Sequence, residues 1–242
     1  MKKVVIIVIL FWMSLILGGC GKKESKVFQN VDNINEKTKV GTISESYAKY
    51  TELKSTAYEK LSNQLSSEEN YNFSVSIGLL GFATMDLSLL PVSFCGLANE
   101  AALAGLGFLY KNIDYKNTEK TCQITFDTDN GIFKYESEYD KSTDSVKTTV
   151  YENDELSIIS EYVKLNKGYA TQFYSIEDNE STIYKSIFDD DKIIVSLETN
   201  KDVPKSIYRN KDIVNEEWTK SEELWAKYEN GNVTSIYEGV EY

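Results

Sequence analysis

The sequence predicts an α+β domain: an N-terminal amphipathic helix and an apolar helical hairpin packed on a curved antiparallel β-meander that forms a partial barrel. Three observations predict it. Apolar residues recur at helical spacing over residues 42–65, residues 73–110 carry almost no charge, and β-forming segments alternate with turn residues after Thr118. Because a one-sided sheet must be covered, we expect one domain at 42–242, with a helical part at 42–115 and the sheet at 118–242.

The first helix is expected to begin near Thr42, because Thr42 and Glu45 have the spacing of a capping box. Its apolar face recurs at intervals of three and four residues and comprises Tyr47, Tyr50, Leu53, Ala57, Tyr58, Leu61 and Leu65. The charged residues are assigned to the other faces: Glu45, Lys49, Glu52, Lys54, Glu59 and Lys60. The pattern predicts an amphipathic helix that packs on a partner surface.

The next region is strongly apolar. Asp86 is the single charge over residues 73–98, and residues 101–110 carry none. Pro91 and Gly96 interrupt the run, so we expect two or three shorter helical segments instead of one rod. Its first residues also alternate as in a strand, but the apolar run continues without alternation, which favours a helix.

Three roles are open to residues 73–110: domain core, the wall of a lipid-binding cavity or membrane-contacting surface, and a second membrane span. We expect core, because the dry face of the sheet has no other cover. A span would place Asp86 near the middle of the bilayer, which is costly. The residues expected to form this core or apolar ligand surface are Phe73, Leu79, Leu80, Phe82, Leu90, Phe94, Leu103 and Phe108.

After Thr118, segments rich in Thr, Tyr, Val, Ile and Phe are separated by turn clusters such as Asp129-Asn130-Gly131. This spacing predicts successive hairpins in an antiparallel meander. We expect strands at 121–128, 132–139, 145–152, 155–165, 169–176, 181–188 and 192–199. A short helical or irregular stretch at 212–221 precedes a last hairpin at 224–228 and 233–237.

The N-terminus has the features of an export signal. Lys2 and Lys3 precede an apolar run at residues 4–17, which is shorter than the roughly 17 to 25 residues that cross a bilayer. The run ends in Leu17-Gly18-Gly19-Cys20, which resembles the lipobox of bacterial lipoproteins. The resemblance implies a signal peptide at 1–19, a diacylglyceryl group and further acylation such as palmitate on Cys20, and a protein anchored at the extracytoplasmic face of the cell membrane. An ordinary secretory signal with an incidental cysteine is the alternative.

Residues 20–41 are expected to link the lipid to the domain. The segment is polar and has few residues able to build a core, which is typical of a flexible tether. A coil of this length reaches on the order of 25 Å from the lipid surface.

The curled sheet with helices in its concavity resembles the half-barrel lipoproteins that carry lipids or sort lipoproteins, at the level of architecture alone. This analogy implies a non-catalytic protein that binds an apolar or amphiphilic ligand, or a membrane-associated partner. The alternative is an interaction or immunity-type surface lipoprotein whose acidic, tyrosine-rich sheet face holds a cationic partner. The tyrosines of that face would be Tyr135, Tyr139, Tyr151, Tyr162, Tyr169, Tyr174 and Tyr184.

Composition narrows the chemistry. The chain has a formal net charge of −12 and no histidine. The negative charge disfavours nucleic acid as a partner. The missing histidine excludes Ser-His-Asp and Cys-His triads and histidine-ligated metals, so we expect neither an enzyme nor a cofactor or metal site. A carboxylate enzyme that works without histidine is the remaining alternative.

Two cysteines and two acidic clusters remain. Cys95 and Cys122 form either a disulfide or two separate buried hydrophobes. Residues 127–131 superficially suggest a calcium loop, but its sixth position is Ile132 where glycine is required, and an Asn-Gly hairpin turn explains them better. The run 189–191 is interpreted as a solvated turn.

Overall fold

A capped helix opens the part of the chain that the computed structural model describes, residues 42–67 and 73–242. Helix α3 (Ile43–Ser67) begins at the predicted capping box: the Glu45 amide donates to Thr42 Oγ1 and the Thr42 amide to Glu45 Oε2, both at 3.4 Å. The predicted signal peptide, Cys20 and the tether lie outside the described residues.

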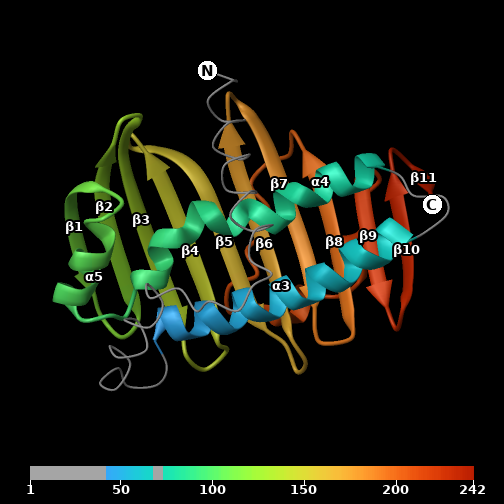
Figure 1. The fold of residues 1–242 in the computed structure, drawn as a ribbon, viewed down its shortest axis with the longest axis horizontal. Coiled ribbons are helices and arrows are strands. Elements are labelled where there is room, and N and C mark those ends of the chain that lie inside the picture. Colours follow the sequence, from blue (N-terminus) through green and yellow to red (C-terminus); the bar gives the residue numbers. More distant parts are fainter. Residues whose placement is uncertain (1–41, 68–72) are drawn as a thin grey trace, which may run out of the picture. The chain divides into compact units, whose positions relative to one another are not determined.

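The apolar region forms helix α4 (Phe73–Thr84), which continues directly into the 3-10 helix η2 (Met85–Phe94), and then α5 (Asn99–Leu106). Pro91 lies inside η2 and does not interrupt it, contrary to expectation, whereas Gly96 adopts a left-handed φ of 92° and turns the chain toward α5. In Figure 1, the continuous helix of α4 and η2 runs antiparallel to α3, and both helices cross the same face of the sheet. We call α3, α4, η2 and α5 the helical layer.

Within the described residues the sheet has eleven strands whose spatial order is their order in the chain, and each strand pairs antiparallel with its neighbours. It is curled but not closed, so the predicted α+β class and meander are confirmed. The strands are β1 (Lys111–Asn117), β2 (Thr121–Thr128), β3 (Gly131–Asp140), β4 (Ser145–Glu152), β5 (Glu155–Lys164), β6 (Tyr169–Glu177), β7 (Glu180–Phe188), β8 (Lys192–Thr199), β9 (Leu224–Glu229), β10 (Asn232–Tyr237) and β11 (Val240–Glu241).

Strand β1 corrects the predicted helical part at 42–115, because the last helix of the layer ends at Leu106. The sequence of β1 is mostly polar and has two apolar side chains in alternation, Ile113, which is partly buried, and Tyr115, which is buried, so its strand signal is short. Several hairpin turns behave as predicted: Asn153-Asp154, Asp178-Asn179 and Asn230-Gly231 have positive φ at both positions, the type I′ pattern that suits a two-residue hairpin.

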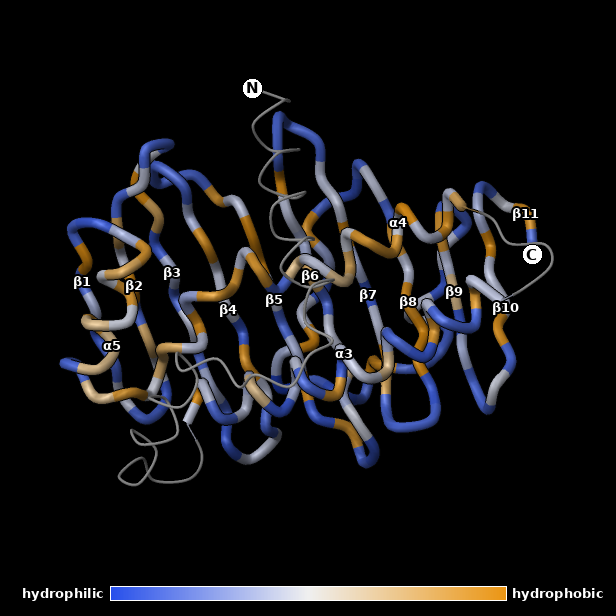
Figure 2. Tube along the Cα trace, viewed as in Figure 1, coloured by the Kyte–Doolittle hydropathy of each residue, from blue (hydrophilic) through white to orange (hydrophobic). Residues whose placement is uncertain are grey.

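The main core lies between the helical layer and the sheet. Its centre is aromatic: the Tyr50 and Tyr162 rings stack at 4.3 Å between centroids with planes 5° apart, and Tyr169 and Phe188 pack against Tyr50. Figure 2 shows α4 and α5 as hydrophobic and the turns at the strand ends as hydrophilic. Aromatic burial of this kind holds helix and sheet together over the middle strands.

The opposite face of the sheet has its own cover. A second buried cluster contains Val163, Ala170 and Ile207, and the segment between β8 and β9, with short 3-10 helices η3 (Lys211–Ile213) and η4 (Glu217–Thr219), packs there. Glu161 is buried on this face and accepts hydrogen bonds from Ser206 Oγ (2.7 Å) and the Ile207 amide (2.8 Å). The irregular stretch predicted at 212–221 therefore closes the far side of the domain.

Candidate functional site

The helical layer is apolar on the side that faces away from the sheet. Phe73 is 66% exposed, Leu87 56% and Phe108 91%. We call the complete exposed set the outer apolar face: Phe73, Ile77, Leu80, Leu87, Leu90, Leu103, Phe108 and Leu109. The same helices bury Val75, Leu79, Phe82, Met85, Leu89 and Val92 toward the sheet. Because soluble monomers rarely expose large contiguous apolar patches, such a surface marks an interaction site.

The structure divides the predicted apolar residues between these two sides. Leu79 and Phe82 belong to the core, and Phe94 is half-buried against it. The other five lie on the outer apolar face: Phe73, Leu80, Leu90, Leu103 and Phe108. The sequence analysis did not single out Ile77, Leu87 or Leu109, since a helix that is apolar all round gives no periodic signal to separate a buried face from an exposed one.

Cys95 and Cys122 are joined in a disulfide, and both are buried. The bond links the end of η2 to strand β2 and so ties the helical layer to the sheet.

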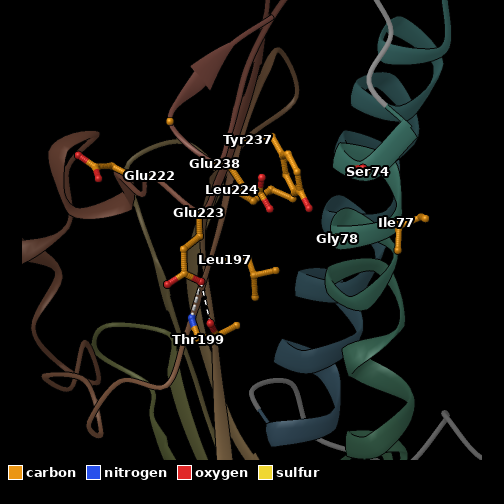
Figure 3. A pocket seen from close by; sticks show the side chains of 11 residues that line it. Ser74, Ile77, Gly78, Leu197, Thr199, Glu222, Glu223, Leu224, Tyr237 and Glu238 are labelled. Atoms are coloured by element: carbon orange, nitrogen blue, oxygen red, sulfur yellow. Dashed lines mark hydrogen bonds between the residues drawn. The ribbon is translucent and has the colours of Figure 1, made fainter.

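A groove of about 690 Å³ opens between α4 and the β8–β10 end of the sheet (Figure 3). One wall is formed by Ile77 and Gly78 of α4 and the other by Leu197, Leu224 and Tyr237. A Cβ added at Gly78 would overlap Leu224 Cδ1, so the glycine lets this helix approach the sheet closely. Ile77 lies both in the groove and on the outer apolar face, which makes the two surfaces continuous.

The polar side chains of the groove are three acids and three hydroxyl groups, the latter from Ser74, Thr199 and Tyr237. Its eleven lining residues include Glu222, Glu223 and Glu238 and neither Lys nor Arg. Glu223 Oε2 accepts hydrogen bonds from the amide (2.7 Å) and the hydroxyl (2.9 Å) of Thr199, and Figure 3 shows the Glu222 carboxylate turned away from α4. The amide of Glu238 donates to the Glu223 carbonyl at 3.0 Å, which holds the β10–β11 turn at the mouth of the groove.

Away from this end, side chains fill the space between helices and sheet. Tyr50 Oη donates to Thr171 Oγ1 at 3.1 Å, and Tyr162 Oη donates to Ser46 Oγ at 2.9 Å. Burial raises the pKa of both phenols well above the ordinary value, so they remain neutral donors. The architectural analogy implied a cavity between sheet and helices, and the groove at the β8–β10 end is a space of that kind among the described residues.

The tyrosines that the interaction-type alternative would place on an open sheet face are mostly inaccessible. Five lie in the core under the helical layer, Tyr174 is also buried, and Tyr151 is half-buried. The buried ones under the layer are Tyr135, Tyr139, Tyr162, Tyr169 and Tyr184. They serve packing, not recognition of a partner.

Two further features of the described residues bear on chemistry. No group of three or more acidic or cysteine side chains comes together there in a way that could hold a metal ion. The continuous helix Phe73–Phe94 has 22 residues and is apolar enough to be a candidate membrane span, by length and composition only. Its inward side chains pack in the core, and its single charge, Asp86, pairs with Lys54 of α3.

Asp127, Asp129 and Asp189–Asp191 lie in or beside turns. Asp129 and Asn130 connect β2 to β3 in the predicted hairpin, and Asp189 Oδ1 accepts the Asp191 and Lys192 amides of its own turn.

Compared with protein-family models, curated proteins and solved structures, the chain matches none of them.

Proposed function

We propose that the protein is a non-catalytic lipoprotein, anchored through Cys20 at the extracytoplasmic face of the cell membrane, and that its helical layer lies against the bilayer and binds membrane amphiphiles. The observation that carries the proposal is the outer apolar face, which has six large exposed side chains on α4, η2 and α5 and two more, Phe108 and Leu109, in the turn after α5. Burying a large apolar side chain contributes roughly 1.5–3 kcal/mol, so partial insertion of several would hold the layer on the membrane.

The charge of the layer supports contact with lipid. Residues 73–110 carry two charges, Asp86 and Glu100. Asp86 is neutralised inside the fold by Lys54, and Glu100 is exposed on α5. Few charged groups of residues 73–110 would therefore lose water at the interface; the exposed charges of the helical layer are on α3, among them Lys49, Glu52 and Glu59.

The point where the tether joins the domain also supports this orientation. The chain enters at Thr42, and the Ser44 amide donates to the Cys95 carbonyl at 3.0 Å. Thr42 also lies against Gly96, between η2 and α5. A lipid on Cys20 would thus be delivered to the layer that carries the outer apolar face, within the roughly 25 Å reach of the tether.

The interaction-type alternative receives less support, because six of the seven tyrosines on which it depends are buried. A role as an enzyme has no support in the residue composition, since the chain has no histidine.

Depth measurements on the mature lipidated protein in liposomes test the orientation. Nitroxide labels are placed at Leu87→Cys and Phe108→Cys on the outer apolar face, with Val203→Cys and Ile132→Cys as controls, 52% and 53% exposed and outside the layer. We expect the first two labels to collide more with oxygen and less with a water-soluble nickel complex than the controls. Equal collision rates at all four positions contradict the proposal.

A pair of charge substitutions separates core from surface. Leu79→Asp should unfold the domain, because Leu79 is 1% exposed. Leu90 lies on the outer apolar face, so Leu90→Asp should leave the free energy of unfolding within about 0.5 kcal/mol of the natural value. The same variant should reduce the depth at which the Leu87→Cys label sits in the bilayer. If Leu90→Asp changes neither quantity, Leu90 does not contact lipid.

A further inference from the structure

We infer that the groove between α4 and the β8–β10 end of the sheet binds a single-chain amphiphile with a cationic head, such as an alkylammonium. The inference rests on the proposed function only in that the bilayer would supply this ligand. The ligand chemistry is argued from the groove itself.

The two walls fit an aliphatic chain. Leu197, Leu224 and Tyr237 line the sheet side of a space of about 690 Å³, within the roughly 300–1,000 Å³ of small-molecule sites. Ile77 lies at its α4 rim with its side chain turned away from the sheet (Figure 3). Gly78 contributes no side chain to the wall and keeps the groove narrow by allowing close approach to Leu224. The apolar side chains of the sheet side can cover a hydrocarbon chain and remove it from water.

The route into the groove is also apolar. Ile77 is 57% exposed and belongs to both the groove and the outer apolar face, and Phe73 lies one helical turn before it. A chain leaving the bilayer could therefore pass along α4 without crossing a charged surface. This continuity favours an amphiphile from the membrane over a ligand from solution.

The negative charge at the groove favours a cationic head group. No Lys or Arg lines the groove. The Glu222 carboxylate turns away from α4 and Glu223 Oε2 is occupied by Thr199, whereas the Glu238 carboxylate forms no hydrogen bond or ion pair within the described residues. A carboxylate or phosphate head would meet like charge there, whereas an ammonium would be attracted. Tyr237, beside Glu238 in the chain, adds a hydroxyl at the same end of the groove (Figure 3).

Photo-crosslinking of the mature lipidated protein in nanodiscs tests the inference. Three probes share one diazirine-bearing alkyl tail and differ in the head: an ammonium, a carboxylate and a glycerol ester. We expect the ammonium probe to label peptides containing Leu197, Leu224 or Tyr237, and excess dodecylammonium to remove the label. The carboxylate probe should label them several-fold less.

The matched variants are Glu238→Gln in the groove and Glu100→Gln on α5. Each variant replaces one exposed glutamate by glutamine and so removes one negative charge. Glu238 lines the groove, whereas Glu100 does not. Glu238→Gln should reduce labelling by the ammonium probe about fivefold, the effect of one exposed ion pair, and Glu100→Gln should not change it.

Equal labelling by all three heads, or no effect of Glu238→Gln, overturns the cationic selectivity. Labelling confined to the outer apolar face overturns the groove as a site, while the depth measurements on Leu87→Cys and Phe108→Cys would still support the proposed function. Labelling of the groove without bilayer contact at those two positions supports this inference and contradicts the proposed orientation.

Discussion

Lys54 Nζ of α3 lies 2.5 Å from Asp86 Oδ2 of η2, and this ion pair joins the two long helices of the layer beneath their outer surface. Lys54 is 2% exposed, its ammonium also donates to the Phe82 carbonyl at 2.7 Å, and it lies over the Phe82 ring. Burial lowers the pKa of Lys54, and the Asp86 carboxylate opposes that shift. The pair is thus the polar centre of an otherwise apolar contact.

We expect Lys54→Ala to lower the free energy of unfolding by roughly 2–4 kcal/mol, because it leaves the half-buried Asp86 without its partner and removes a buried side chain. Denaturant titration followed by intrinsic fluorescence measures the change. Lys49→Ala, on the exposed side of the same helix, is the control. The double variant Lys54→Met, Asp86→Leu should recover most of the loss. If the double variant is no more stable than Lys54→Ala, the pairing argument is wrong.

Gly81→Ala tests the close approach of α4 to the sheet. Alanine normally stabilises a helix over glycine by about 0.5–1 kcal/mol. Here a Cβ at Gly81 would overlap the Tyr184 hydroxyl, which donates to the Gly78 carbonyl at 3.1 Å. We therefore expect a loss of about 1–3 kcal/mol in thermal or denaturant unfolding. The same change in a Tyr184→Phe background should cost less, and a gain in stability from Gly81→Ala alone contradicts the packing.

The Cys95–Cys122 bond closes a segment with a sequence separation of 27. By the loop-entropy model it contributes about 3–4 kcal/mol, so reduction should lower the denaturation midpoint markedly. Thiol labelling of denatured, non-reduced protein measures the bond directly. Two free thiols in protein taken from the cell surface would refute it.

Alkaline pH should destabilise the fold. Burial is the main cause that raises the pKa of Tyr139, Tyr169 and Tyr184 to about 12, and the Asp144 carboxylate adds to it for the first two. In the unfolded chain the same phenols ionise near 10, so their stabilising contribution is complete below pH 10 and is lost as the pH rises toward 12.

Each phenol that ionises only on unfolding lowers the free energy of unfolding by about 1.4 kcal/mol per pH unit in that window. The lowered pKa of Lys54 makes the free energy of unfolding rise with pH, which is opposite to the effect of the tyrosines. Because it is one group against several tyrosines, the tyrosines determine the sign. Denaturant titrations at pH 9, 10 and 11 should show a falling midpoint, and Tyr184→Phe should reduce the slope. A flat profile over this range is incompatible with buried tyrosines.

Cys20→Ala tests the predicted anchor. The variant should accumulate as an uncleaved precursor or be released, and it should no longer incorporate labelled fatty acid. Cys95→Ala provides the comparison, because that residue lies in the folded domain. Normal processing and lipidation of Cys20→Ala would show that the lipobox assignment is wrong.

Local sequence determined the features that need no distant partner. The capping box of Thr42 and Glu45, the hairpin turn at Asn230-Gly231 and the strands from β2 to β10 follow from side-chain chemistry within a few residues, because caps, turns and alternation are local. The same patterns specified an α+β meander covered by helices. The lipobox at Cys20 likewise depends on adjacent residues alone and stays a prediction here.

Only the tertiary structure decided which side of each element is covered. Lys54 was assigned to solvent from its charge, yet α4 and η2 bury it against Asp86, a residue 32 positions later in the chain. The apolar helices have no periodicity that separates Leu79, in the core, from Leu90, on the outer apolar face. The groove joins α4 to strands more than 100 residues away, and such a surface exists only once long-range packing has brought Gly78 against Leu224.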